Sequence, residues 1–395
     1  MNYNAFKADP SSRDQLFCFP ESGKNRKAIQ FEIMHHDNRL RLFDKFAPSN
    51  NPIMKLAERI ESFSDLGRIL RDTLEGKKGK YKDPLEKLVA DQQFRNGWFT
   101  PQNVVMALSA IANELTQDKL TEWTGRYPAL REQAESANIG VIMAGNIPLV
   151  GFHDFLSVLI TGNRVIARTS SKDPDLIVLI GEMLGEINPA FRNKITITTG
   201  LLKDFDAVIA TGSDNSSRYF QYYFGRSPHI IRKNRNSIGI IERNETGAEL
   251  AGLGTDVFSY FGLGCRSISK IYVPEGYDVK ALAESWSAHC KLVEHNKYAN
   301  NYDYSKAVFI VNKYDFIDTG FLLCRMEKSL ASPVAVLHYE YYKSLEYVYQ
   351  EIEGMKDKIQ CIAGRGNTPF GKAQMPELWD YADGIDTIEF LLKKK

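Results

Sequence analysis

The chain has 395 residues, of which 43% are hydrophobic and 25% are charged, as in an ordinary globular protein of about two or three domains. Its net charge of +1 gives no electrostatic reason to expect binding to nucleic acid or to an anionic membrane surface. The most apolar run, residues 139–160, is interrupted by polar residues and a proline. It therefore predicts a buried strand and helix, and no membrane span.

The cysteines bear on the compartment in which the protein works. The five cysteines are odd in number and widely spaced, which disfavours a disulfide framework, and no Cys-x-x-Cys pair indicates a metal site. Residues 1–13 are polar, so no signal peptide is expected. These features favour a reducing cytoplasm.

Residues 1–115 carry few functional signals. Residues 29–33 and 40–43 predict short strands joined across His35 and His36, and no third ligand is spaced to make this pair a metal site, so a turn is favoured. Residues 54–75 have a helical pattern, and Thr100-Pro101 predicts the start of a second helix that ends near Leu115.

From Asn138 onward, short apolar strands alternate with helices. Such alternation predicts a parallel, doubly wound sheet, which binds its ligands at the carboxyl ends of the strands. The expected strands are 139–143, 165–167, 195–198 and 207–210. The expected helices are 149–160 behind Pro148, 173–187 capped by Asp173, and one that Thr211-Gly-Ser-Asp214 opens and that ends near Phe224.

Polar residues follow three of these strands. Asn146 follows the first and could donate to an oxyanion, and Arg168-Thr-Ser-Ser-Lys172 follows the second and could bind phosphate or ribose. Gly212-Ser213 follows the fourth, at a helix amino terminus that favours phosphate. Each also has a structural reading, as a turn former, a surface charge and an N-cap. No Gly-x-Gly-x-x-Gly fingerprint occurs, which disfavours an ordinary Rossmann dinucleotide site.

Cys265 lies in the turn Gly262-Leu-Gly-Cys-Arg-Ser, between an expected helix over 246–261 and an expected strand over 269–273. A glycine turn can present a thiolate to a cleft, where it could carry a covalent acyl group. The alternative is a small, inert core residue.

The ordered motifs around Asn146, Gly212-Ser213 and Cys265 resemble those of the aldehyde dehydrogenase superfamily, and more closely its LuxC-like branch of long-chain acyl-CoA reductases. Residues 298–304 and 370–386 also resemble that branch. The resemblance implies an α/β fold with a doubly wound parallel-sheet cofactor domain, an α/β catalytic domain and a small oligomerisation element. The implied domains are 1–137 as an N-terminal part of the cofactor domain, 138–235 as the nucleotide-binding domain, 236–375 as the catalytic domain, and 376–395 as an oligomerisation segment or tail.

The resemblance also implies roles for single residues. Cys265 takes the place of the nucleophile, and Asn146 with the backbone N–H of Cys265 would form the oxyanion hole. Ile231 falls where acid-forming relatives carry a glutamate base, which implies a reductase and not an acid-forming dehydrogenase. The implied cofactor contacts are Arg168, Ser170 and Ser171 on the ribose side, Gly212 and Ser213 at the pyrophosphate, and Glu327 at the nicotinamide ribose, where the spacing to Pro333 differs by about two residues from the family pattern.

The implied reaction is the NADPH-dependent reduction of a long-chain acyl-CoA or acyl thioester to a fatty aldehyde through an acyl-cysteine. NADP(H) is expected ahead of NAD(H), because Ser171 would not repel a 2′-phosphate that Arg168 and Lys172 could neutralise. A homodimer or homotetramer is expected, and an acyl-protein synthetase is a possible partner. The alternatives are reduction of an acyl phosphate, oxidation of an aldehyde, or a non-catalytic acyl-binding subunit of a fatty-acid reductase complex.

Overall fold

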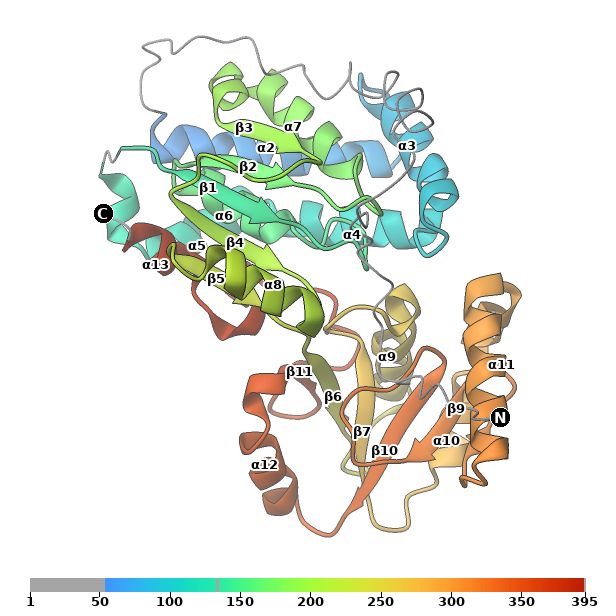
Figure 1. Ribbon diagram of the computed structural model, residues 1–395. Helices are drawn as coiled ribbons and strands as arrows, with labels where there is room; N and C mark the ends of the chain where they lie inside the picture. The colour runs from blue at the N-terminus through green and yellow to red at the C-terminus, as the bar shows by residue number, and fades with distance from the viewer. Residues whose placement is uncertain (1–53, 133–134, 394–395) are drawn as a thin grey trace, which may run out of the picture. The chain divides into compact units, whose positions relative to one another are not determined.

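The computed structural model describes residues 54–132 and 135–393. They form two compact units, each built around one sheet (Figure 1). The five-stranded unit comprises the described residues up to 233 together with 376–393, and the six-stranded unit is Asn234–Met375. The strands expected over 29–43 and the paired histidines lie outside the described residues.

The five-stranded unit has an all-parallel sheet in the order β3-β2-β1-β4-β5. Its strands are β1 Asn138–Ile142, β2 Arg164–Arg168, β3 Ile195–Thr198, β4 Ala207–Thr211 and β5 His229–Arg232. Its helices are α2 Leu56–Leu74, α3 Lys82–Arg95, α4 Pro101–Glu114, α5 Gln117–Gly125, α6 Phe152–Ile160, α7 Leu176–Ile187, α8 Asp214–Phe224 and α13 Thr387–Leu392, with short 3-10 turns η2 Pro128–Arg131, η3 Pro189–Asn193 and η7 Ala382–Gly384.

The two faces of this sheet are covered by different helices. Side chains of α2, α6 and α7 share one large apolar core with β1–β5. On α8, Phe220 packs in a separate cluster with Ile142, Val208 and Ala210. A sheet covered on both faces reads as near-continuous apolar strands, which is the pattern the sequence shows.

The C-terminal residues 376–393 pack onto the five-stranded unit. The Tyr381 hydroxyl accepts a hydrogen bond from Trp123 Nε1 at 2.8 Å and lies 2.8 Å from the Tyr127 hydroxyl. Arg232, which is buried at the end of β5, donates to Thr387 Oγ1 at 2.8 Å and to the Asp154 carboxylate at 2.7 Å. These contacts hold residues 376–393 on the five-stranded unit. The role of this segment in oligomerisation stays a prediction.

The six-stranded unit has the strand order β11-β6-β7-β10-β9-β8, parallel throughout except for β8 against β9. Its strands are β6 Asn236–Ile240, β7 Ile268–Pro274, β8 Ile317–Asp318, β9 Leu323–Met326, β10 Val336–Tyr342 and β11 Ile359–Ala363. Its helices are α9 Gly247–Phe258, α10 Val279–Ser285, α11 Asn296–Val311 and α12 Leu345–Glu353, with 3-10 turns η4 Ser259–Gly262, η5 Ser287–Glu294 and η6 Lys356–Lys358.

Helices again cover both faces of the sheet. On one face, side chains of α9 and α10 pack against β7 and β10 around the buried Trp286. On the other face, Val348 and Ile352 of α12 pack against Ile238 and Tyr272. The start of α9 is set locally, because Thr246 and Glu249 form a reciprocal capping box.

Three expected helix ends are wrong. The helix expected from 149 begins at Phe152, because Leu149 adopts a left-handed conformation with φ 55°. The helix expected from Asp173 begins at Leu176 with Asp175 at the N-cap. The helix expected to reach residue 261 ends at Phe258, because Tyr260 and Phe261 are also left-handed.

Across 54–132 and 135–393, none of the helices is both long and apolar enough to cross a membrane.

Candidate active site

The carboxyl edge of the five-stranded sheet brings together three segments that the sequence singles out. Strand β1 lies between β2 and β4, with Ile142 paired to Arg168 on one side and to Ala210 on the other. The order of the strands reverses here, and such a switch point is where open α/β sheets bind ligands. The Asn146 turn, the Arg168 loop and the Gly212 loop therefore start from neighbouring strands.

The Asn146 turn is packed tightly on the loop after β2. A Cβ atom added to Gly145 would lie 2.6 Å from Ser170 Oγ and 3.0 Å from Lys172 Cβ, so no larger residue fits without a shift. Asn96 Nδ2 also donates to the Gly145 carbonyl at 3.4 Å. Ser170 is buried, whereas Asn146 is exposed to solvent. The backbone is thus fixed where Asn146 projects from it.

Asp173 fixes the far end of the same turn. Its buried carboxylate accepts a hydrogen bond from the backbone N–H of Leu149 at 2.8 Å, and Leu149 is the left-handed residue that delays α6. Burial raises the pKa of Asp173 to about 7, although the hydrogen bond from Leu149 opposes the shift. The sequence pattern predicted Asp173 only as a helix cap and gave no sign of its hydrogen bond with Leu149.

The loop after β2 presents both buried and exposed polar groups. Arg168 Nε and Thr169 Oγ1 are buried and have no hydrogen-bond partner within the described residues. Ser171 and Lys172 are exposed. Buried polar atoms without partners are costly, so their presence together marks a place where a polar ligand would be stabilised.

The start of α8 supplies the third segment. Ser213 is the N-cap, and its hydroxyl accepts a hydrogen bond from Ser216 N at 3.2 Å. A Cβ atom on Gly212 would lie 2.8 Å from both Phe220 Cε2 and Ser216 Cβ, so this position requires glycine for close packing. The N-cap reading of Ser213 is therefore confirmed, and the other N–H groups of the first turn still favour an anion.

Cys265 belongs to the six-stranded unit. It is half-buried and lies between η4 and β7, and its carbonyl accepts a hydrogen bond from Ser237 Oγ at 2.8 Å. The residues before it are left-handed at three successive positions, Tyr260, Phe261 and Gly262, with φ values of 53°, 57° and 75°. Backbone strain of this kind is found preferentially at functional sites.

The other described cysteines differ from Cys265 in exposure. Cys324 is buried, and burial raises the pKa of its thiol to about 12, which keeps it protonated and inert at neutral pH. Cys361 is buried beside the Thr368 hydroxyl at 3.3 Å, and Cys290 is exposed. Cys18 lies outside the described residues.

Glu327 follows β9 in the six-stranded unit, and its carboxylate is engaged by its own loop. Oε1 accepts from the backbone N–H of Lys328 at 2.8 Å and of Ser329 at 3.3 Å, and Oε2 lies 3.1 Å from Arg325 Nη2. Burial would raise the pKa of Glu327, but the two backbone donors and Arg325 outweigh burial and lower the pKa. Glu327 is therefore a carboxylate held in a fixed orientation.

A buried lysine that the sequence analysis missed holds the loop after Glu327. Lys270 Nζ lies 2.7 Å from Glu340 Oε2 and donates to the Lys328 carbonyl at 2.8 Å. Ser269 Oγ donates to the Leu330 carbonyl at 2.7 Å. Lys270 and Ser269 both belong to β7, so this strand holds the loop at two points. The available signal was a lysine inside the apolar strand Ile268–Pro274.

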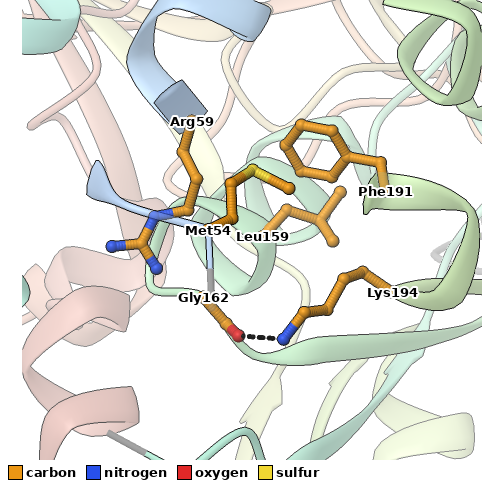
Figure 2. Close-up of a pocket in the computed structure, with 6 residues that line it drawn as sticks. All are labelled: Met54, Arg59, Leu159, Gly162, Phe191 and Lys194. Carbon is orange, nitrogen blue, oxygen red and sulfur yellow. Dashed lines mark hydrogen bonds between the residues drawn. The ribbon is translucent and has the colours of Figure 1, made fainter. Parts of the chain in front are cut away.

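Two further cations, Arg59 and Lys194, line a small pocket that Figure 2 shows, and Lys194 directly precedes β3. Lys194 Nζ donates to the Gly162 carbonyl at 2.8 Å, and the buried Arg59 lies against Gly162 and donates to the Leu130 carbonyl at 3.3 Å. Burial lowers the pKa of Arg59 to about 10 and that of Lys194 to about 8. Both cations face the carboxyl end of α6, where positive charge stabilises a helix, so their role is structural.

Comparison with solved structures identifies the fold of this protein. It matches a putative aldehyde dehydrogenase from Burkholderia cenocepacia with a TM-score of 0.58 at 14% identity, over 79% of this chain and 75% of that chain. It also matches a Mycobacterium tuberculosis aldehyde dehydrogenase complexed with NAD+, with a TM-score of 0.57 at 14% identity, over 82% and 75% of the two chains. The protein therefore has the aldehyde dehydrogenase fold, as the sequence predicted.

The family is narrower than the fold. The model of the acyl-CoA reductase (LuxC) family matches residues 96–336, which is more than half of the chain, so the chain belongs to this family. A long-chain acyl-protein thioester reductase from Aliivibrio fischeri is 23% identical over 228 residues, which are 53% of this chain and 47% of that protein. The match thus spans about half the length of that relative. Family membership confirms the predicted resemblance.

Proposed function

We propose that the protein reduces a long-chain acyl thioester, either acyl-CoA or an acyl-protein, to an aldehyde through an acyl group carried by Cys265. The observation that carries this proposal is the half-exposed position of Cys265 on a strained turn in a member of the acyl-CoA reductase family. The thioester reductase from Aliivibrio fischeri supports the choice of substrate class.

The chain's own residues account for the acyl transfer. The Cys265 thiolate attacks the thioester carbonyl carbon, a new C–S bond forms, and the bond to the CoA sulfur breaks as CoA leaves as a thiolate. Asn146 and the backbone N–H of Cys265 are the proposed donors to the oxyanion that forms during the attack. Reduction of the acyl-cysteine by hydride releases the aldehyde and returns Cys265 as a thiolate.

A nicotinamide cofactor would supply that hydride when bound. The carboxyl edge of the five-stranded sheet fits such a group, because Arg168 Nε and Thr169 Oγ1 are buried there without partners among the described residues, and the first turn of α8 offers N–H groups. Arg168, Ser170 and Ser171 would hold the ribose side, and Gly212 with Ser213 the pyrophosphate. Glu327 is the proposed contact of the nicotinamide ribose.

We assign the preference to NADP(H) over NAD(H). Ser171 is exposed and carries no charge that would repel a 2′-phosphate, and the exposed Lys172 follows it directly. The Mycobacterium tuberculosis aldehyde dehydrogenase of the same fold is complexed with NAD+, which supports a nicotinamide site here.

The absence of a base at position 231 favours reduction over hydrolysis. Ile231 is half-buried and packs against the apolar cluster of Ile142, Val208, Ala210 and Phe220, so it can neither take a proton nor attract water. The acyl-enzyme should therefore persist until hydride arrives. A cytoplasmic location, a homo-oligomer and an acyl-protein synthetase partner complete the proposal.

Intact-mass analysis tests the proposal directly. The protein is mixed with long-chain acyl-CoA, with and without NADPH. We expect a burst of CoA release, one acyl group on Cys265 and slow turnover without NADPH, and release of aldehyde with it. Cys265→Ala should abolish both steps, whereas Cys290→Ala, at an exposed cysteine, should leave them unchanged. Normal turnover by Cys265→Ala would refute the mechanism, and rapid formation of free fatty acid would reveal a base in the site.

A further inference from the structure

The strained turn before Cys265 needs a structural cause. Two of its left-handed residues, Tyr260 and Phe261, have bulky side chains, and each such residue costs about 1–2 kcal/mol. Both side chains are buried, and the Phe261 ring lies 4.5 Å from the His295 ring. Strain of this size persists only where the surroundings hold the backbone in place.

One support comes from the segment 370–386, which resembles the corresponding segment of the LuxC-like branch and has no role in the proposed reaction. Residues 370–374, which we call the strap, lie on α9. A Cβ atom on Gly252 would be 2.8 Å from the Phe370 carbonyl oxygen, so strap and helix are in direct backbone contact. Asp256 on α9 is 0% exposed, and its two oxygens accept hydrogen bonds from Gly371 N at 2.6 Å and Ala373 N at 3.1 Å.

The strap also reaches the turn itself. Gln374 Nε2 donates to Ser267 Oγ at 3.3 Å, and Ser267 Oγ donates to the Ser259 carbonyl at 3.2 Å. Ser259 directly precedes the left-handed residues, and Ser267 lies two residues after Cys265. The chain of contacts from Asp256 through the strap to Ser267 therefore ties both limbs of the turn together.

We infer that Asp256, Gln374 and Ser267 are positioning residues, which hold the Cys265 turn in the strained conformation needed for attack on the acyl donor. The inference rests on the proposed function of Cys265. It assigns a role to the strap, which is to hold the nucleophile at a fixed distance and angle from its substrate. Misplacement by about 1 Å is enough to slow such a reaction by about two orders of magnitude.

The test compares two reactions of the same sulfur in the full chain. Acylation by long-chain acyl-CoA depends on the orientation of Cys265 and is followed as the burst of CoA release. Alkylation by iodoacetamide depends only on access and thiolate content. We expect Gln374→Ala and Ser267→Ala to slow acylation by about tenfold or more, while alkylation of Cys265 changes by less than about threefold. Asp256→Asn, which keeps only one acceptor, should act in the same direction.

Controls separate positioning from loss of fold. Thr255→Ala removes an exposed hydroxyl beside Asp256 on α9 and should leave both rates unchanged. Global loosening would expose the buried Cys324 and Cys361 to alkylation together with Cys265. Acylation at the wild-type rate in folded Gln374→Ala and Ser267→Ala would overturn the positioning role and leave the proposed function of Cys265 intact. Wild-type protein that takes no acyl group on Cys265 would overturn the proposed function, and the inference with it.

Discussion

Replacing Gly145 by alanine tests whether the tight turn at the carboxyl edge of the five-stranded sheet is a structural requirement. The new Cβ would meet Ser170 Oγ at 2.6 Å and Ser170 Cβ at 2.8 Å. Ser170 is only 7% exposed, so it cannot swing into solvent. Overpacking of this kind costs about 1–3 kcal/mol, and the reduced entropy of the unfolded chain returns about 0.4–1 kcal/mol. We expect a net loss of about 1–2 kcal/mol in the free energy of unfolding.

Urea denaturation of the full chain measures this loss, and a second substitution identifies its cause. Ser170→Gly removes both atoms that approach closest, so Gly145→Ala should cost about 1 kcal/mol less in that background than in the wild type. Gly79→Ala is the control, because a Cβ there has nothing within 4 Å.

Two results would refute this reasoning. If Gly145→Ala were as stable as the wild type, the turn would have room that the structure does not show. If its cost were the same with Ser170 and with glycine at position 170, the contact with Ser170 would not be the source of the strain.

Three further predictions concern the cofactor, the buried Lys270 and the partly buried Lys194. Ser171→Glu should raise KM for NADPH much more than for NADH in steady-state assays, because a carboxylate repels the 2′-phosphate; equal increases would count against the assigned preference. Lys270→Ala should lower the free energy of unfolding by about 3–5 kcal/mol, because it leaves Glu340 without its buried partner. Lys280→Ala, at an exposed lysine, should change the free energy of unfolding by less than about 0.5 kcal/mol. Equal effects of the two substitutions would show that Lys270 and Glu340 are not coupled. The pKa of Lys194 is about 8 when folded and 10.5 in its ordinary state, so the unfolded chain binds more protons between these values. The stability of the wild type relative to Lys194→Met should therefore rise from pH 7 to pH 10, and a fall would contradict the desolvation of this partly buried lysine.

Much of the architecture could be predicted from local patterns. The expected strand 195–198 is β3 with the same ends, and the expected cap at Ser213 is observed. A strand or an N-cap depends on residues within a few positions along the chain, so its signal is present in the sequence. The position of Cys265 before a strand followed from the same kind of evidence, and the order of motifs indicated the family.

Tertiary contacts decided what local patterns could not. Asp173 precedes a helix, as a cap would, but its carboxylate holds Leu149, 24 residues earlier, in a left-handed turn. Asp256 and Lys270 look like misplaced polar residues within apolar elements. Their partners Gly371 and Glu340 lie 115 and 70 residues away. A buried carboxylate or ammonium group is stable only when such partners are present. Those partners are brought close by the register of the strands and the packing of the helices, so only the folded chain shows which polar residues hold the cysteine turn and its neighbouring loops.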